Sequence, residues 1–124
     1  QDSDADTMLV GGLWEEASID SKVWRTFTIV TVPANDKMSL IHNNPKNPNR
    51  MPLILRPDQV DEWISPTNPG DKPAMDRLKN DLIQPYPSDG LKYTSVAQLQ
   101  GKSGVGDSEK AHEVHIYPEL DILV

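Results

Sequence analysis

The sequence predicts an α+β fold with a mostly antiparallel, barrel-like sheet and short peripheral helices. About four segments rich in β-branched and aromatic residues alternate with about three short helical patterns in no regular order. The 124 residues include 11 prolines and 7 glycines, a content that predicts many loops and short helices. A chain of this length can bury one small core but not two.

The clearest strand patterns lie in the first half of the chain. Val23–Val32 is dense in β-branched and aromatic residues, and apolar side chains on both of its faces predict a central strand. Thr7–Trp14 is a second pattern, in which Gly11 and Gly12 permit a bulge or close packing of backbones. Arg50–Leu55 is a third apolar run.

Three short helices are predicted after Val32. Asn35 or Asp36 caps the first, and Pro57 opens the second, where its missing N–H costs nothing. The three patterns span Pro33–His42, Arg56–Ile64 and Ala74–Ile83. Further strands are expected at Leu91–Val96 and Val114–Tyr117.

Composition limits the chemistry. The chain has no cysteine, which excludes a disulfide, a thiolate zinc site and a cysteine nucleophile within this polypeptide. A net charge of −7 disfavours broad attraction to nucleic acid, although it allows a local basic groove. No apolar run approaches membrane-spanning length, and the first residues lack the basic and apolar regions of a signal peptide, so we expect a cytoplasmic protein without membrane contact. We also expect a monomer. Because the chain starts at Gln1 without an initiator methionine, we expect it to be part of a longer protein.

The loop from His42 to Arg50 is the main candidate site because it carries no carboxylate and would accept an anion. The His42 imidazole is suited to proton transfer near neutral pH. Arg50 could hold a phosphate by two parallel hydrogen bonds, with Lys46 and Asn43 as further contacts. The alternatives are structural: a histidine bonded to a nearby carbonyl, and an arginine solvated at the surface.

Other polar groups give weaker hypotheses. His112 and His115 lack a third ligand fixed by sequence, so no metal site and no cofactor are predicted. Adjacent Glu15 and Glu16 point to opposite faces of a strand and are expected to end it and meet solvent. The three tryptophans are interpreted as core or core-edge residues rather than as base-stacking platforms.

Five motifs in order resemble the second half of the SRAP family, the SOS-response-associated peptidase-like proteins. They are GGLWE at Gly11–Glu15, FTIVTVPAND at Phe27–Asp36, IH at Ile41–His42, RMPLIL at Arg50–Leu55 and DEWI at Asp61–Ile64. The series spans about half of the chain, and from Ser65 onward the match is loose. The resemblance implies that residues 1–124 are the carboxy-terminal part of a single SRAP-like domain, so that the fold is incomplete in this chain.

The resemblance also implies an activity. SRAP proteins bind single-stranded DNA, and an amino-terminal cysteine attacks the ring-opened sugar of an abasic site to close a thiazolidine ring. His42 matches the family's catalytic histidine, and Arg50 matches an arginine near the DNA backbone. A bacterial, cytoplasmic protein, associated with the nucleoid when bound to DNA, is implied as well.

The chain departs from the family pattern at two points. The cysteine, its partner asparagine and the upstream glutamate have no match, and Glu15 belongs to a later motif, so this chain alone should not crosslink DNA. Seven residues separate His42 from Arg50 where the family has one, which could displace Arg50. Two alternatives remain open: a non-catalytic SRAP-like binding or scaffold module, and an autoproteolytic peptidase, a hydrolase rather than a lyase-like activity.

Overall fold

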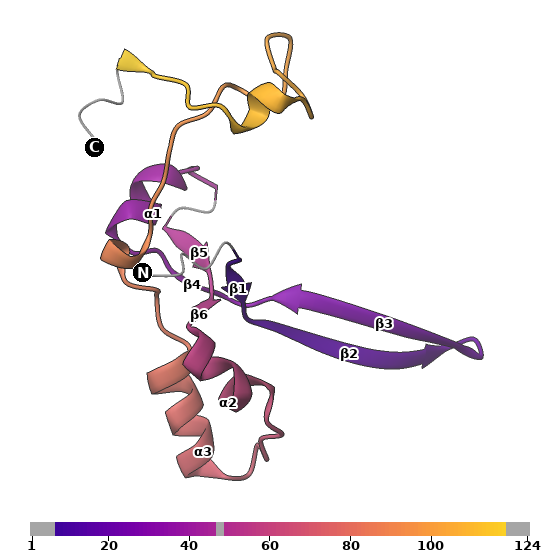
Figure 1. Ribbon diagram of the computed structural model, residues 1–124. Coiled ribbons are helices and arrows are strands. Elements are labelled where there is room, and N and C mark those ends of the chain that lie inside the picture. The colour runs from indigo at the N-terminus through magenta and orange to yellow at the C-terminus, as the bar shows by residue number, and fades with distance from the viewer. Residues whose placement is uncertain (1–6, 47–48, 119–124) are drawn as a thin grey trace. The chain divides into compact units, whose positions relative to one another are not determined.

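The computed structural model describes residues 7–46 and 49–118, which fall into two compact units. The first unit extends to Gly90 and the second begins at Leu91. The first contains the strands and helices labelled in Figure 1. They are β1 (Leu9–Val10), β2 (Gly12–Ile19), β3 (Lys22–Ile29), β4 (Thr31–Pro33), α1 (Asp36–Ile41), β5 (Arg50–Pro52), β6 (Ile54–Leu55), α2 (Val60–Ile64) and α3 (Lys72–Arg77). Positions 47 and 48 of the His42–Arg50 loop lie outside the described residues.

Three chain segments meet at a junction formed by Gly11, Val30 and Leu53. The Gly11 N–H donates to the Leu53 carbonyl (2.8 Å), the Leu53 N–H to the Val30 carbonyl (2.8 Å), and the Val30 N–H to the Gly11 carbonyl (3.0 Å). At these residues each segment changes its pairing partner, which gives three two-stranded antiparallel sheets: β1–β6, β2–β3 and β4–β5. We call this arrangement the strand junction.

The strand junction explains why the predicted strands appear divided. Thr7–Trp14 is interrupted at Gly11, where an added Cβ would lie 2.8 Å from Leu53 Cδ2. Val23–Val32 and Arg50–Leu55 are interrupted at Val30 and Leu53. Mixed α and antiparallel β structure is therefore confirmed. Among the described residues there is no closed barrel, so the barrel-like part of the prediction is not confirmed.

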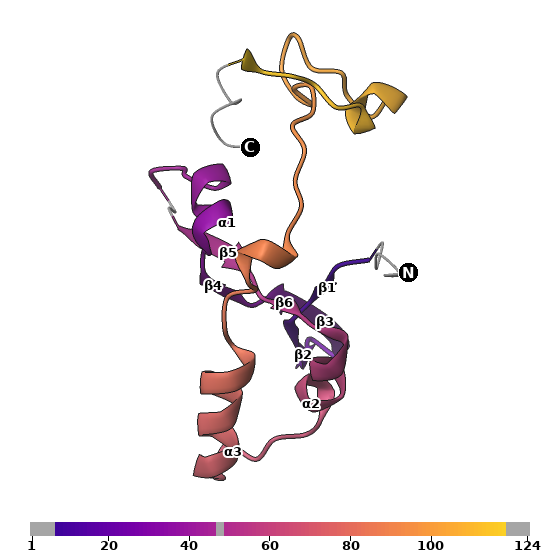
Figure 2. The same cartoon turned by 60° about the vertical axis from the view of Figure 1, so that its left-hand side comes forward.

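The buried core lies at this junction. Fully or nearly fully buried side chains come from the segments that cross it and from the end of the last helical turn: Val32, Met51, Leu53, Ile54, Leu55 and Leu82. In Figures 1 and 2, α1 lies beside β4 and β5 at one end of the junction, while α2 and α3 lie at the other end, beyond β6. The candidate loop thus starts and ends on elements that adjoin the core.

The paired strands β2 and β3 form a two-stranded ribbon that stays outside this core. We call Gly12–Ile29 the ribbon. Asp20 and Ser21 have φ values of 49° and 63° and form its tight turn, as a two-residue hairpin requires. Every residue of both strands is exposed. Two predictions are therefore wrong for the described structure: β3 pairs only with β2 and is not central, and Glu15 and Glu16 do not end the strand, which runs to Ile19.

The tryptophans also differ from the prediction. Trp14 is 73% exposed and Trp24 is 55% exposed, because the ribbon carries both away from the buried core. Trp63 is half-buried and donates Nε1–H to the Gly12 carbonyl (3.3 Å), which ties α2 to the base of the ribbon. Ile64, expected to face inward, is 70% exposed.

The first two helices follow their predicted starts, and the third begins earlier than predicted. Asn35 caps α1 by accepting the Met38 N–H (2.9 Å), and Asp71 caps α3 in the same way through Ala74 (3.2 Å). α3 begins two residues before the predicted Ala74–Ile83 helix. It continues as one π-helical turn, Leu78–Leu82. A 3₁₀ turn at Pro57–Gln59 precedes α2.

A bidentate ion pair connects α2 and α3. Arg77 Nε and Nη2 lie 2.5 Å and 3.2 Å from the two carboxylate oxygens of Glu62. The hydrogen bond that Arg77 donates to Glu62, together with the charge of the Glu62 carboxylate, raises the pKa of Arg77 above the ordinary value for arginine.

The second unit contains little regular structure. A 3₁₀ turn spans Glu109–His112, and one isolated bridge joins Val96 to Val114. Among the described residues, the strands predicted at Leu91–Val96 and Val114–Tyr117 do not form. The two segments are joined by this bridge, by the bond from the His115 N–H to the Ser95 carbonyl (2.9 Å), and by side-chain bonds from Ser95 Oγ to the His115 carbonyl (2.6 Å) and from the Tyr117 hydroxyl to the Val96 carbonyl (3.1 Å). A strand needs a ladder of such bonds, and a single bridge does not supply one.

Candidate functional site

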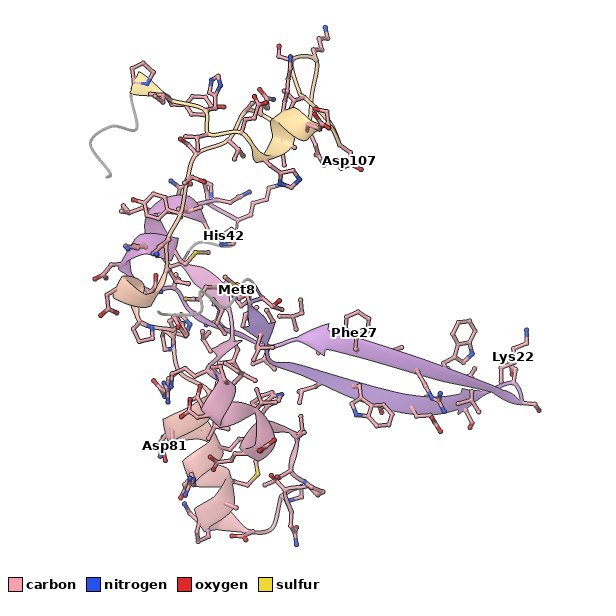
Figure 3. All side chains as sticks on the ribbon, in the orientation of Figure 1. Met8, Lys22, Phe27, His42, Asp81 and Asp107 are labelled. Carbon is pink, nitrogen blue, oxygen red and sulfur yellow. The ribbon has the colours of Figure 1, made fainter. Side chains whose placement is uncertain are left out.

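His42 lies at the carboxyl end of α1. Its N–H donates to the Met38 carbonyl (2.7 Å), so the residue caps the helix. Asn35 fixes the other end of α1: besides its capping bond, its Nδ2 donates to the Tyr86 carbonyl (2.6 Å). Helix and histidine are thereby held against the chain that leaves the last helical turn. Figure 3 shows the labelled His42 side chain beyond the end of α1.

The His42 ring is oriented by Arg50, through backbone rather than side chain. His42 Nδ1 lies 3.0 Å from the Arg50 carbonyl oxygen. A carbonyl oxygen only accepts hydrogen bonds, so the neutral ring carries its proton on Nδ1 and keeps the lone pair on Nε2. The residue is exposed, and among the described residues no group forms a hydrogen bond with Nε2. The carbonyl bond predicted for a structural histidine is present, and it also prepares the other nitrogen to accept a proton.

Arg50 is held by the neighbouring strand. Its Nη2 donates to the Thr31 carbonyl (2.7 Å) and lies 3.0 Å from Thr31 Oγ1. Within the described part of the chain, no carboxylate pairs with the guanidinium, and Nε and Nη1 make no hydrogen bond. The group is therefore positioned by a neutral partner and keeps its full positive charge.

The long loop does not separate its two ends. Besides the contact between His42 and Arg50, the Ala34 N–H donates to the Asn49 carbonyl (2.8 Å), and Asn49 adopts a φ of 60°. That left-handed conformation turns the chain into β5. The sequence interval that could have displaced Arg50 thus leaves it beside His42.

The other two predicted contacts lie on the same loop. Asn43 and Lys46 are both exposed. The Lys46 N–H donates to Asn44 Oδ1 (3.0 Å), a local turn that leaves the ammonium group of Lys46 unconstrained by this bond. Their proposed contacts with DNA remain predictions.

The remaining candidates are not brought to this site. Glu15 and Glu16 lie on the ribbon, where Glu16 pairs with Arg25 (2.8 Å). His115 packs edge-on against Tyr117, with ring centroids 4.6 Å apart, in the second unit. Over residues 7–46 and 49–118, no three histidine or acidic side chains come together in a way that could hold a metal ion.

Sequence reasoning missed the partner that positions Arg50. Thr31 was predicted only as part of the Val23–Val32 strand. Its pairing with Pro52 brings it next to Arg50, and this register is set by the strand junction. Asn35 was predicted as one of two possible caps. Its bond to Tyr86 spans 51 residues, so the local sequence could not predict it.

Residues 1–103 match the family model of the SOS response associated peptidases (SRAP). The chain therefore belongs to the SRAP family. Residues beyond 103, which include both histidines of the second unit, lie outside the match.

Three similar curated proteins share one description. Abasic site processing protein YoqW of Bacillus subtilis is 35% identical over 74 residues, which cover 60% of this chain and 28% of that protein. Abasic site processing protein YoaM, from the same organism, has the same identity and coverage. Abasic site processing protein YobE of Bacillus subtilis is 30% identical over 89 residues, which cover 71% of this chain and 36% of YobE.

The matches extend over only part of these relatives. This chain spans 28% to 36% of the length of the curated relatives described above. No solved structure matches it. Among the described residues, no helix combines the length and apolar character needed to cross a bilayer.

Proposed function

We propose that this chain is the carboxy-terminal part of a DNA abasic-site processing protein, and that it supplies an acid–base group and an anion contact to a site completed by the rest of that protein. The support is its membership of the SRAP family, the shared description of three relatives, and the exposed pair of His42 and Arg50. The observation that carries most weight is the bond from His42 Nδ1 to the Arg50 carbonyl, because it leaves Nε2 as the proton acceptor.

The proposed substrate is single-stranded DNA with an abasic site, and the nucleophile is a cysteine outside this chain. Its amine adds to the sugar aldehyde, water leaves to give an imine, and its thiol then adds to the imine carbon to close a thiazolidine. One water is released overall, and no oxidant is needed. His42 Nε2 takes and returns the protons that these additions and the loss of water require.

Arg50, Lys46 and Asn43 are the proposed DNA contacts. Arg50 keeps N–H groups beyond those used by Thr31, so it can donate to a phosphate without leaving its place. Lys46 adds a positive charge on a loop without carboxylates. Holding the phosphate next to the abasic sugar would keep the aldehyde near its attacker.

The test uses the whole polypeptide that carries this sequence, mixed with single-stranded DNA containing an abasic site. A covalent adduct that survives a denaturing gel is expected. His42→Asn is the informative variant, because its side-chain amide can still donate to the Arg50 carbonyl while the Nε2 base is lost. We expect adduct formation to slow by about 100-fold. His112→Ala, which changes another exposed histidine, is the matched control and should leave the rate unchanged.

Three results would contradict the proposal or redirect it. An equal rate for His42→Asn and wild type would assign His42 a structural role only. DNA binding without any adduct would favour the scaffold alternative. Cleavage of other peptides, with no adduct, would favour the autoproteolytic peptidase.

DNA binding is tested separately by titration at several salt concentrations. Lys46→Ala should weaken binding to all single-stranded sequences alike and reduce the slope of log affinity against log salt by about 0.7. Lys22→Ala, at the tip of the ribbon, is the matched control for charge. Arg50→Ala should have the same effect on the slope. An unchanged slope for Lys46→Ala and Arg50→Ala would place this loop away from DNA.

A further inference from the structure

The ribbon presents large apolar side chains to solvent. Phe27 is 84% exposed and stands clear of β3 in Figure 3, and Trp14, directly opposite it in the β2–β3 pairing, is 73% exposed. The other large exposed side chains of the ribbon are Leu13, Ile19, Val23, Trp24 and Ile29. A contiguous apolar surface of this kind on a folded protein marks a site of interaction.

Both faces of the ribbon carry large apolar side chains. Side chains alternate along a strand, so the pairing places Trp14, Phe27, Val23 and Ile29 on one face, together with Glu16, Ser18 and Arg25. Leu13, Ala17, Ile19 and Trp24 lie on the opposite face, together with Glu15, Lys22, Thr26 and Thr28. A ribbon with one side on a core and one in water would collect its apolar residues on one face. Large apolar side chains on both faces instead indicate strands that are covered on both sides.

The ribbon also has a free strand edge. The two-residue turn makes Ile19 and Lys22 the hydrogen-bonded closing pair, so every second residue of β2 directs its backbone groups away from β3. These residues are Gly12, Trp14, Glu16 and Ser18. The Gly12 carbonyl has this outward direction, since it accepts the Trp63 indole N–H on that side. From Trp14 to Ser18 the edge can pair with a further strand.

A cavity lies where this edge meets α2. Its volume is about 360 Å³, and it is lined by Gly12, Leu13 and Trp14 of β2, Trp63 and Ile64 of α2, Ser65 and Thr67 of the chain that follows α2, and Leu78 of the π-helical turn. A strand added along β2 would end beside this cavity and could place one large apolar side chain in it. The free edge and the cavity adjoin, because Gly12 and Trp14 belong to both.

We propose that the ribbon is the docking surface for the remainder of the parent SRAP polypeptide, which adds a strand to the β2 edge and covers both faces with apolar residues. The relatives are long enough to do so, because the region matched by this chain is only 28% to 36% of their length. A second copy of this chain pairing through one face or one edge would leave the opposite face in water. The inference rests on the proposal that this chain is part of a longer protein, and not on the DNA chemistry.

The test compares equally exposed apolar residues in the whole polypeptide. Phe27→Ser should lower the melting temperature by about 10 °C or more, because a side chain buried by the docked segment is lost. Trp24→Ser, on the opposite face, should have a similar effect. Ile116→Ser is the control, since Ile116 is 72% exposed and lies outside the family match, and it should change the melting temperature by less than about 2 °C. If Phe27→Ser yields no folded protein while Ile116→Ser does, the milder variant Phe27→Leu is used instead, and it should lower the melting temperature by a smaller, measurable amount.

Hydrogen exchange supplies the second measurement. The outward amides of Trp14, Glu16 and Ser18 should exchange slowly in the whole polypeptide and rapidly in the 124-residue chain. Rapid exchange in both, or a Phe27→Ser change no larger than that of the control, would overturn the inference. Sedimentation of the 124-residue chain as a dimer that Phe27→Ser converts to monomer would overturn it in favour of a second copy. None of these measurements involves DNA, so the docking surface and the adduct chemistry can fail independently.

Discussion

The strand junction and the ribbon are made of the same kinds of residue and lie in opposite environments. Around the junction, Val32, Met51 and Leu53 are almost completely buried. Along the ribbon, the side chains of Trp14 and Phe27 are larger than those three, yet both are mostly exposed to solvent. The difference lies in the number of chain segments that meet: three at the junction, two at the ribbon. Strand-forming composition therefore predicts strands, while burial depends on what else packs against them.

The largest effect is expected from a substitution in the junction. Leu53→Ala removes a side chain that is 0% exposed and should lower the free energy of unfolding of the 124-residue chain by about 3 kcal/mol. Phe27→Ala removes a larger side chain from the ribbon and should cost less than about 1 kcal/mol, because little contact is lost. Urea denaturation of the two variants measures both. Equal shifts of the two midpoints would mean that the ribbon is covered in solution by the chain itself.

An intermediate effect is expected where the ribbon leaves the junction. In Gly11→Ala the new methyl group would lie 2.8 Å from Leu53 Cδ2 and 3.2 Å from Leu53 Cγ, so the core must shift. A cost of about 1–3 kcal/mol is expected from this overpacking. Gly70→Ala is the control, because its new atom would meet only the Asn68 side chain, at 3.3 Å. Thermal unfolding followed by circular dichroism compares them, and a tolerated Gly11→Ala would show that the junction is loosely packed.

The smallest effect is expected on the ribbon itself. Arg25 and Glu16 pair at 2.8 Å, but their side chains are 77% and 45% exposed. Water screens such a pair, so Arg25→Met should change the free energy of unfolding by less than about 0.5 kcal/mol. The difference between variant and wild type, measured by urea denaturation, should vanish in 1 M salt. A larger or salt-independent loss would indicate that Arg25 packs against more than Glu16.

Whether a part of the site could be predicted depends on how far apart in the sequence the interacting residues lie. The cap and the end of α1 follow from neighbours in sequence: Asn35 was one of two predicted caps, and the predicted pattern ended at His42, one residue beyond the end of α1. The bond between His42 and the Arg50 carbonyl, and the hold of Thr31 on the guanidinium, cross eight and 19 residues. They depend on how β4 pairs with β5, and that register is imposed by the strand junction rather than by local propensity.

The strands predicted beyond Gly90 show the same limit of prediction from local sequence. Leu91–Val96 and Val114–Tyr117 have strand-like composition, but among the described residues they are joined by an isolated bridge at Val96 and Val114 rather than by a ladder. A ladder forms only where two segments stay in register over several residues. Composition does not reveal whether they do.

The sequence by itself determined the α+β class, the region in which the first helix is capped, the family and the loop that carries His42, because turn residues, capping side chains and motif order act over a few neighbouring positions. Only the tertiary structure decided that three segments exchange partners at Gly11, Val30 and Leu53, that the ends of the long loop meet, and that the ribbon lies open on both faces. These features depend on contacts between residues tens of positions apart, and the free energy of such contacts is set by packing and solvent exclusion, which no short stretch of sequence encodes.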